Sequence, residues 1–172
     1  MIFLETERLR LRALRPDDLS ALAAYRRDPA CYRYQRGQHN SDAKPAELIA
    51  ANASPSLHSP GCCQLGIAWK SSDELCGDVF VNIAPPTITL GYTVSPKYQR
   101  QGCACELLHA LVPFLCRQWP ECEIVCLVEP ENTPSIGLLE KPGFVRECYA
   151  EQLISFIYVF LPGGDADAIQ PQ

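Results

Sequence analysis

The residues of this chain best suited to chemistry lie in a short turn at positions 99–104, which reads Gln-Arg-Gln-Gly-Cys-Ala. An alternating apolar segment precedes the turn and a helical pattern follows it, so the turn lies where a strand leads into a helix. The first amides of a helix have no partner within it and carry a partial positive charge. Gly102 and Ala104 leave room for a phosphate group, and Arg100 adds a formal charge. The turn predicts an anion site, although helices without a ligand also begin at small residues.

Ten cysteines are the other residues that could act as nucleophiles or metal ligands. Cys103 and Cys105 fall at the predicted helix start, where the helix lowers the pKa of a thiol, so a nucleophilic role is one interpretation. The cysteines form no paired C-x-x-C set. We therefore expect reduced thiols that mainly fill the core, and no metal site.

Strands that alternate apolar and polar residues must position the turn. The period-two pattern predicts strands at residues 4–14 and 88–94. Two short apolar runs at 65–69 and 79–83 flank a polar turn at 70–74, which is typical of an antiparallel hairpin. The arginines of the first strand, Arg8, Arg10 and Arg12, favour a solvated strand face over an acidic acceptor site.

Helical patterns separate these strands. Asp17 can cap a helix that follows the first strand, and residues 28–60 are the segment we expect to be mobile or to face a substrate. The other predicted elements are helices at 106–119, kinked at Pro113, and at 133–141, and strands at 123–128, 144–147 and 153–160. The pattern predicts an α/β (α+β) fold with a central mixed, mostly antiparallel sheet flanked by helices.

Length and composition limit the classes of protein. The chain has 172 residues, of which 47% are hydrophobic, and we expect one domain over residues 1–162 with a flexible tail at 163–172. The net charge of -5 argues against a broad nucleic-acid surface. No apolar run is long enough to span a membrane, and the acidic start lacks the features of an export signal. We expect a cytoplasmic protein without membrane or nucleic-acid partners.

Two segments of the chain resemble the GNAT acetyltransferases. The cofactor turn of that family reads Gln/Arg-x-x-Gly-x-Gly/Ala, which residues 99–104 match. Further along, residues 129–135 and the Leu-Glu-Lys-Pro-Gly-Phe run at 139–144 are similar to the family's second cofactor segment. The resemblance implies the GNAT fold, in which two strands splay apart after the strand at 88–94 so that acetyl-CoA enters the gap.

The start of the chain points to one branch of that family. Residues 5–12, together with a Gly-Asp pair at 77–78 and a Gly-Tyr pair at 91–92, are similar to the branch that includes ribosomal-protein N-terminal acetyltransferases. The resemblance extends over roughly residues 4–160. It identifies the acyl donor and leaves the acceptor open, because acceptor pockets vary on one scaffold.

The resemblance also implies roles for single residues. The backbone around Thr93 and Val94 would bond the pantetheine arm, Asn132 would reach the same arm, and Ser135 would lie near the thioester sulfur and protonate the leaving thiolate. The residues that it assigns to cofactor binding are Thr93, Val94, Gln99, Arg100, Gln101, Gly102, Cys103, Ala104, Asn132 and Ser135.

Alternatives stay open at several of these positions. Asn132 can equally cap the helix that follows it, and Ser135 can be a purely structural hydroxyl. Many relatives carry a tyrosine acid in the second segment, where this chain has Leu139, and Pro142 also departs from the family pattern by ending the helix early. For the general base, Asp78 and Glu74 are the candidates, acting directly or through water.

The sequence predicts an acyl-CoA-dependent N-acyltransferase that moves an acetyl group from acetyl-CoA to a primary amine, of a protein N-terminus or of a small molecule. The amine would attack directly in a ternary complex, and backbone amides near Val94 would stabilise the oxyanion. A non-catalytic CoA-binding or regulatory module that has lost its acceptor site is the alternative, and a thiol-rich scaffold without a ligand is a third reading. A homodimer is compatible with the sequence.

Overall fold

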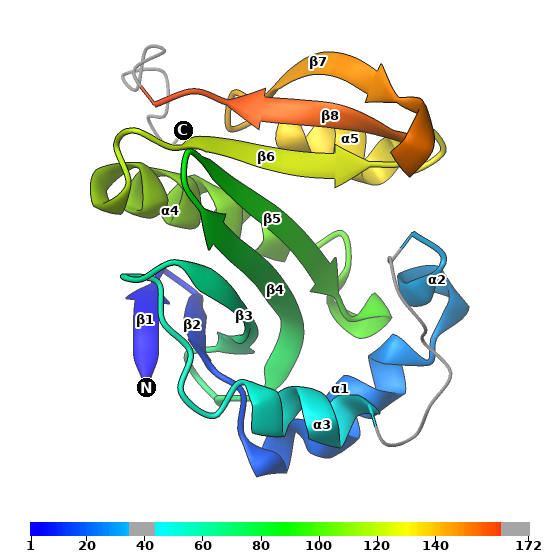
Figure 1. Cartoon of the computed structure of the whole chain (residues 1–172). Coiled ribbons are helices and arrows are strands. Elements are labelled where there is room, and N and C mark those ends of the chain that lie inside the picture. Colours follow the sequence, from blue (N-terminus) through cyan, green and yellow to red (C-terminus); the bar gives the residue numbers. More distant parts are fainter. Residues whose placement is uncertain (35–43, 163–172) are drawn as a thin grey trace.

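The computed structural model describes residues 1–34 and 44–162 of the chain. Within them, eight strands form one sheet in the order β1-β2-β3-β4-β5-β6-β8-β7 (Figure 1). Neighbouring strands of this described part pair antiparallel, except β5 and β6, which run parallel. The strands are β1 (Ile2–Glu5), β2 (Leu9–Ala13), β3 (Gly61–Trp69), β4 (Leu75–Ala84), β5 (Thr87–Val94), β6 (Glu123–Val128), β7 (Val145–Ala150) and β8 (Ser155–Phe160).

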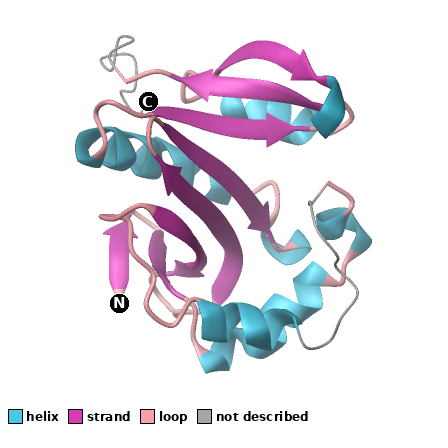
Figure 2. Cartoon of the chain, in the orientation of Figure 1, coloured by secondary structure: helices cyan, strands magenta, loops and turns pink. Residues whose placement is uncertain are grey.

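Helices pack on both sides of this sheet (Figure 2). They are α1 (Leu19–Arg26), α2 (Pro29–Tyr32), α3 (Lys44–Ala51), α4 (Cys103–Gln118) and α5 (Thr133–Leu139), with single 3-10 turns η1 (Pro16–Asp18), η2 (Pro96–Tyr98) and η3 (Glu151–Leu153). The arrangement confirms the predicted mixed, mostly antiparallel sheet flanked by helices.

The alternation of β4 separates two layers. Val79 and Val81 are fully buried in the main core, which also contains Leu107 and Leu111 of α4. Asp78, one position before Val79, points to the opposite face of the sheet, where the hydroxyl of Tyr25 in α1 donates a hydrogen bond to it. One strand thus supplies apolar side chains to the core and a carboxylate to the other face.

The boundaries of two predicted elements change in the structure. The first predicted strand is two strands, β1 and β2, that fold back on each other. The helical pattern at 106–119 belongs to α4, which begins three residues earlier, at Cys103, where the turn was predicted to open a helix; Gly102 precedes it in a left-handed conformation (φ 80°). Pro113 lies inside α4, which continues through it to Gln118.

The prediction that the arginines of the first strand share a solvated face is wrong for Arg12. Its side chain is 1% exposed and donates to both carboxylate oxygens of Asp18, at 2.7 and 2.8 Å. Its Nε also donates to Asp73 at 3.0 Å. Asp18 and Asp73 come from η1 and from the β3–β4 turn, and they cover a strand face that alternation alone would leave in water.

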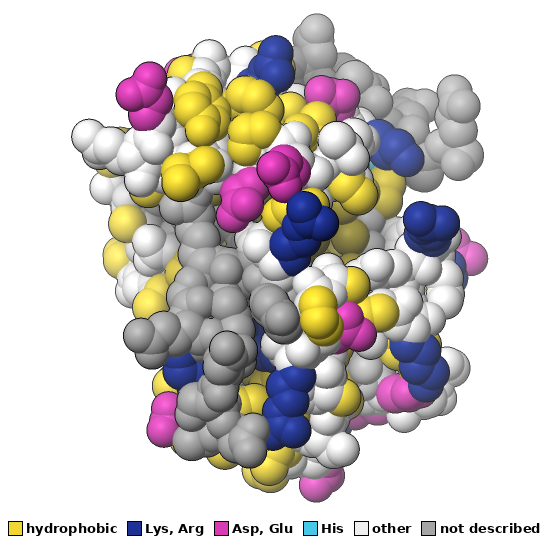
Figure 3. Space-filling view, turned by 90° about the vertical axis from the view of Figure 1, so that its right-hand side faces the viewer, with side chains coloured by type: hydrophobic (Ala, Val, Ile, Leu, Met, Phe, Trp, Pro, Cys, Tyr) yellow, Lys and Arg dark blue, Asp and Glu magenta, His cyan; other side chains and the backbone are white. Residues whose placement is uncertain are grey.

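Figure 3 shows the face of the molecule that looks to the right in Figure 1. Hydrophobic side chains gather on its upper part, where the β7–β8 hairpin lies. The most exposed apolar residues of this hairpin are Val145, Tyr149, Leu153 and Ile154. None of the helices in residues 1–34 and 44–162 is long and apolar enough to cross a membrane.

Candidate active site

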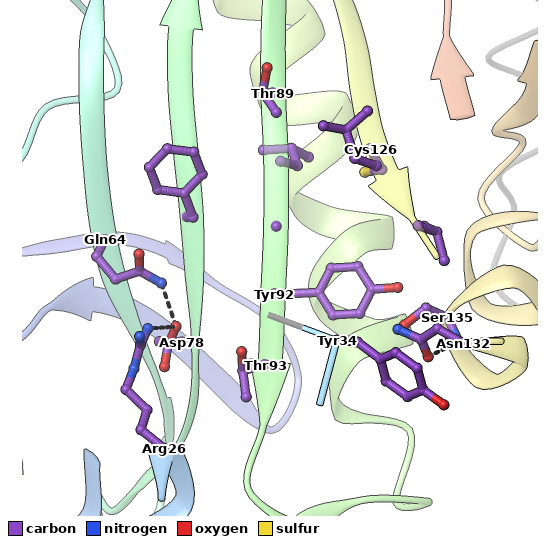
Figure 4. Close-up of a pocket in the computed structure, with 15 residues that line it drawn as sticks. Arg26, Tyr34, Gln64, Asp78, Thr89, Tyr92, Thr93, Cys126, Asn132 and Ser135 are labelled. Carbon is purple, nitrogen blue, oxygen red and sulfur yellow. Dashed lines mark hydrogen bonds and ion pairs between the residues drawn. The ribbon is translucent and has the colours of Figure 1, made fainter. Parts of the chain in front are cut away.

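A cavity of about 430 Å³ opens where β5 and β6 diverge (Figure 4). The two strands pair from Thr87 with Glu123 to Leu90 with Cys126, and the ladder goes no further. The cavity continues from this point across β5 to the face of β4 that carries Asp78 and Phe80. The residues that line it are Arg26, Tyr34, Gln64, Asp78, Phe80, Thr89, Leu90, Gly91, Tyr92, Thr93, Cys126, Leu127, Val128, Asn132 and Ser135.

The predicted turn at 99–104 enters α4 with two residues in the left-handed region. Arg100 has φ 60° and Gly102 has φ 80°. Gly102 provides no side-chain cap, so the first amides of α4, those of Cys103 and Ala104 among them, stay without a partner inside the helix. A side chain at position 102 would be strained at this φ, and its Cβ would lie 3.4 Å from Arg8 Nη2. The turn therefore offers backbone donors and a partial positive charge to an anion, as predicted from its sequence.

Side chains of the turn fold back onto the strand that precedes it. Gln99 Nε2 donates to the carbonyl oxygen of Val94 at 3.0 Å, and Gln101 Nε2 donates to the carbonyl oxygen of Lys97 at 3.1 Å. Both carboxamides therefore serve the shape of the turn. The backbone amides of the turn remain available to a ligand, and these are the groups to which the resemblance assigned pyrophosphate binding.

The sequence did not predict that Arg8 braces the turn. Arg8 Nη2 donates to the carbonyl oxygen of Gln101 at 3.0 Å, and Arg8 Nε donates to Glu106 Oε2 at 2.7 Å. Burial alone would raise the pKa of Glu106, but the hydrogen bonds from Thr6 and Arg8 outweigh it and lower that pKa. The N-terminal Thr-Glu-Arg segment thus fixes both the turn and the first turn of α4, a contact between segments far apart in the chain.

Asn132 and Ser135 lie together at the far wall of the cavity. The Asn132 side chain caps α5 by accepting from the Ser135 amide at 3.4 Å, which confirms the capping interpretation. Both residues also line the cavity, so capping does not remove Asn132 from the site. Thr93 lies across from them on β5 and lines the cavity too, whereas Val94 is not among the lining residues.

Two tyrosines narrow the cavity between β5 and α5. Tyr34 lies in the segment predicted to face a substrate, and its hydroxyl donates to the carbonyl oxygen of Glu131 at 3.3 Å. This bond ties the chain after α2 to the loop before α5. Tyr92 projects from β5 into the gap (Figure 4). Residues 35–43 of that predicted segment lie outside the described residues.

Asp78 lies at the other end of the cavity and is fully buried. Its Oδ1 accepts from Arg26 Nη2 at 2.7 Å and from the side-chain amide of Gln64, and its Oδ2 accepts from the Tyr25 hydroxyl. Burial, followed by the negative charge of Asp78, raises the pKa of Tyr25 well above its ordinary value. Tyr25 therefore remains a neutral donor. Asp78 is the carboxylate that the described residues bring to the cavity wall, and Oδ2 keeps one lone pair.

Glu74, the second predicted base, lies elsewhere. It is exposed, it precedes β4, and it is not among the residues that line the cavity. Lys97 Nζ donates to its Oε1 at 2.8 Å, and this hydrogen bond lowers the pKa of Glu74. Since an ion-paired carboxylate outside the cavity cannot reach a substrate held there, we do not retain Glu74 as a base.

Of the cysteines near the site, Cys103 and Cys126 are core residues, whereas Cys105 is half-buried and its Sγ lies 3.5 Å from His109 Nδ1. Cys103 is 2% exposed, its Sγ donates to the carbonyl oxygen of Tyr98, and burial raises its pKa despite the opposing charge of Arg8. Burial also raises the pKa of Cys126, which lines the cavity. Thiols held neutral in this way are poor nucleophiles. All ten cysteines are free thiols.

The sequence model of the family described as "Acetyltransferase (GNAT) domain" matches residues 8–145. The match spans most of the chain, from the brace at Arg8 through the turn to the second segment. The chain belongs to the GNAT acetyltransferase family. It is thus an acyl-CoA-dependent N-acetyltransferase that takes its acetyl group from acetyl-CoA.

Comparison with individual proteins agrees with this family. The chain is 30% identical over 148 residues to the uncharacterized N-acetyltransferase p20 of Bacillus licheniformis, covering 84% of this chain and 83% of that protein. A GNAT-family acetyltransferase from Bacillus anthracis has a similar structure, with a TM-score of 0.82, 22% identity and coverage of 94% and 99%. RimL, a ribosomal L7/L12 alpha-N-protein acetyltransferase solved in complex with coenzyme A, gives a TM-score of 0.78 at 19% identity, with coverage of 96% and 100%.

The geometry of the described residues fits an acetyl-CoA molecule. The helix start supplies backbone donors for the anionic pyrophosphate, and the gap between β5 and β6 opens toward Asn132 and Ser135. Residues 99–104 themselves do not line the cavity. A narrow gap of this kind suits a thin, extended chain of amides. The cavity then continues to Asp78, which leaves space for a second substrate beyond the acyl group.

Proposed function

We propose that this GNAT acetyltransferase transfers the acetyl group to a primary amine, of a protein N-terminus or of a small molecule, by direct attack in a ternary complex. The observation that supports this is the continuity of the cavity. One lined space contains Thr93, Asn132 and Ser135 at the donor end and Asp78 at the other. Two substrates can therefore meet without either leaving its place.

The proposed assignments combine that space with the turn before α4, whose residues do not line it. The amides of the turn, from Gln99 to Ala104, hold the pyrophosphate, while the backbone near Thr93 and Val94 and the carboxamide of Asn132 hold the pantetheine arm. Amides near Val94 face the carbonyl oxygen as it gains charge. RimL acts on a protein N-terminus according to its description, and the similar fold makes peptides a sensible part of the acceptor panel.

The proposed reaction conserves atoms and protons. The amine nitrogen uses its lone pair to form a bond to the thioester carbonyl carbon, and the carbon–sulfur bond breaks with its electron pair going to sulfur. Ser135 gives its hydroxyl proton to the sulfur as the thiolate leaves. The surplus proton of the nitrogen passes through water to Asp78, the lining carboxylate. Asp78 then releases this proton to solvent and Ser135 takes one from solvent, so both groups return to their starting state. The products are an N-acetylated amine and the free thiol.

A screen for thiol release tests the proposal. The purified protein is incubated with acetyl-CoA and a panel of peptides, polyamines, amino acids and aminoglycosides, with its ten cysteines blocked or subtracted. We expect at least one amine to accelerate thiol release well above the rate in water, with acetylated product seen by mass spectrometry. Tight CoA binding with no acceleration by any amine would favour the non-catalytic CoA-binding module instead.

The two predicted bases form a matched pair for the same assay. Asp78→Asn should lower turnover, whereas Glu74→Gln should leave it within about twofold, because Glu74 does not line the cavity. The reverse pattern would contradict the assignment of the proton acceptor. Equal binding of CoA by both variants would show that the donor site is intact.

A further inference from the structure

The hydroxyl of Tyr92 is a buried polar group that the chemistry described above does not use. It has no hydrogen-bond partner within residues 1–34 and 44–162. The ring projects from β5 toward α5, and its hydroxyl is turned to the side of the cavity where Ser135 and Asn132 lie (Figure 4). A buried hydroxyl without a partner is destabilising, so its placement calls for a partner that the site itself supplies.

The surroundings of Tyr92 make it a donor of a hydrogen bond and a poor source of protons. Burial raises its pKa, while the nearby hydroxyl of Ser135 acts in the opposite direction and does not cancel the effect. A phenol with a raised pKa keeps its proton when it faces a thiolate, whose ordinary conjugate acid is stronger. Tyr92 can therefore orient a neighbour without being ionised itself.

Ser135 needs such a neighbour. Its backbone amide donates to Asn132 Oδ1 at 3.4 Å, which fixes the main chain at the start of α5. The hydroxyl still rotates about its own bond, because a serine has a single proton and two lone pairs. A donor placed beside the oxygen would occupy one lone pair and leave the proton directed elsewhere.

We propose that Tyr92 is a positioning residue whose hydroxyl, which makes no hydrogen bond among the described residues, turns during the reaction to donate one to Ser135 Oγ, so that the Ser135 proton points at the sulfur of the leaving thiolate. The inference rests on the proposed role of Ser135. In this arrangement the tyrosine comes from β5 and stays protonated. Leu139 of α5, where many relatives have a tyrosine acid, is fully buried and has no part in it.

A double-mutant cycle in the full-length protein tests the coupling. The variants are Tyr92→Phe, which removes one hydroxyl, Ser135→Ala, and the two together. Tyr149→Phe is the matched control, because this phenol is 45% exposed on β7 and packs edge to face with Phe156 at a centroid distance of 5.6 Å. Turnover is followed with an amine identified in the screen.

We expect Tyr92→Phe to lower kcat about tenfold with the KM for acetyl-CoA unchanged, and the double variant to be no slower than Ser135→Ala. Tyr149→Phe should match the parent protein. Losses of the two single variants that multiply in the double variant would overturn the inference, because they would show independent roles. A raised KM with normal kcat would also overturn it, since that pattern marks a packing role.

Titration of bound CoA gives a second measurement that needs no acceptor. The ultraviolet absorbance of the CoA thiolate is followed against pH, and the complex with desulfo-CoA is subtracted to cancel the protein cysteines. A hydrogen bond from Ser135 favours the thiolate, so Ser135→Ala and Tyr92→Phe should each raise the pKa of the bound thiol, by about 1. If Ser135→Ala changes nothing, the proposed role of Ser135 fails. If Ser135→Ala raises the thiol pKa and Tyr92→Phe does not, only the role of Tyr92 is wrong.

Discussion

Two arginine–aspartate pairs are buried against this sheet, and their surroundings differ. Arg12 of β2 meets both oxygens of Asp18, and the two side chains are 1% and 6% exposed. Arg26 of α1 meets Asp78 through one nitrogen at 2.7 Å, and its side chain is 21% exposed while that of Asp78 is 1% exposed. Arg26 also has a buried Nε without a partner in the described part of the chain.

The difference separates a structural pair from a pair in the site. The bidentate Arg12–Asp18 pair has its donors and acceptors used by protein, so it holds η1 against the sheet and offers nothing to a ligand. Arg26 and Asp78 both line the cavity, and they keep a donor and a lone pair in reserve. Removing one partner should therefore cost stability in the first pair and activity in the second.

The largest effect is expected from Arg12→Met. This change leaves Asp18 buried without its counter-ion, which destabilises proteins by about 3–5 kcal/mol. Urea unfolding should show this loss in free energy, while the protein that stays folded should keep nearly normal kcat. Arg15→Gln is the control, because Arg15 is 43% exposed and a surface ion pair contributes about 1 kcal/mol or less. Equal losses from both changes would contradict the structural role of Arg12.

Asp78→Asn should produce the next largest effect, and this effect should be on turnover rather than on stability. The isostere keeps the shape of the cluster but cannot take a proton, so kcat should fall about 100-fold, equivalent to about 2.7 kcal/mol. Stability should fall less than in Arg12→Met, because Arg26 can turn its charge toward the cavity. Stopped-flow or steady-state thiol release measures kcat, and urea unfolding measures the free energy of unfolding. A normal kcat in Asp78→Asn would show that a group other than Asp78 accepts the proton.

Arg26→Gln should have a smaller effect than Asp78→Asn. Glutamine can still donate to Asp78, and the arginine is partly exposed, so we expect a stability loss of about 1 kcal/mol. The KM for the acceptor amine should rise more than the KM for acetyl-CoA, since Arg26 lies at the end of the cavity away from α5. A selective rise in the KM for acetyl-CoA would contradict this placement of the two substrates.

The smallest effect concerns acid stability near Arg12. Burial alone would raise the pKa of Asp73, but the charges and hydrogen bonds of Arg12 and Arg15 outweigh it and lower the pKa below its ordinary 3.8. A carboxylate with a lowered folded pKa stabilises the protein above the unfolded value, and this contribution is lost as the pH falls below about 3.8. Asp73→Asn should therefore narrow the difference in Tm between about pH 6 and about pH 3. An unchanged difference would show that Asp73 is not stabilised by its arginines.

Local patterns predicted much of this molecule. The hairpin of β3 and β4, the alternating β5, the buried β6 and the turn before α4 all follow from periodicity and from small residues at a helix start. The turn alone predicted only an anion site, and it was the second segment, from Asn132 onward, that identified the family. That segment could be recognised because its residues are close together in the chain.

The contacts that escaped prediction join residues far apart in the chain. Arg12 alternates like a solvent-facing residue, and only the folded positions of Asp18 and Asp73 make it a buried one. The brace from Arg8 to Glu106 and the cluster of Gln64 with Asp78 have the same origin. The periodicity of the sequence does not predict such contacts, since they depend on which elements the topology places side by side.

The divergence of β5 from β6 has one more consequence. Where the ladder ends at Leu90, the second half of β5 becomes a strand edge inside the molecule. Edges on a protein surface can capture strands of other chains and start aggregation, and proteins protect them with charge, proline or covering elements. Here covering elements protect the edge, because it lies on the wall of the cavity and faces Asn132 and Ser135 rather than the outer surface. Substitutions that widen this gap should therefore be examined for self-association as well as for lost activity.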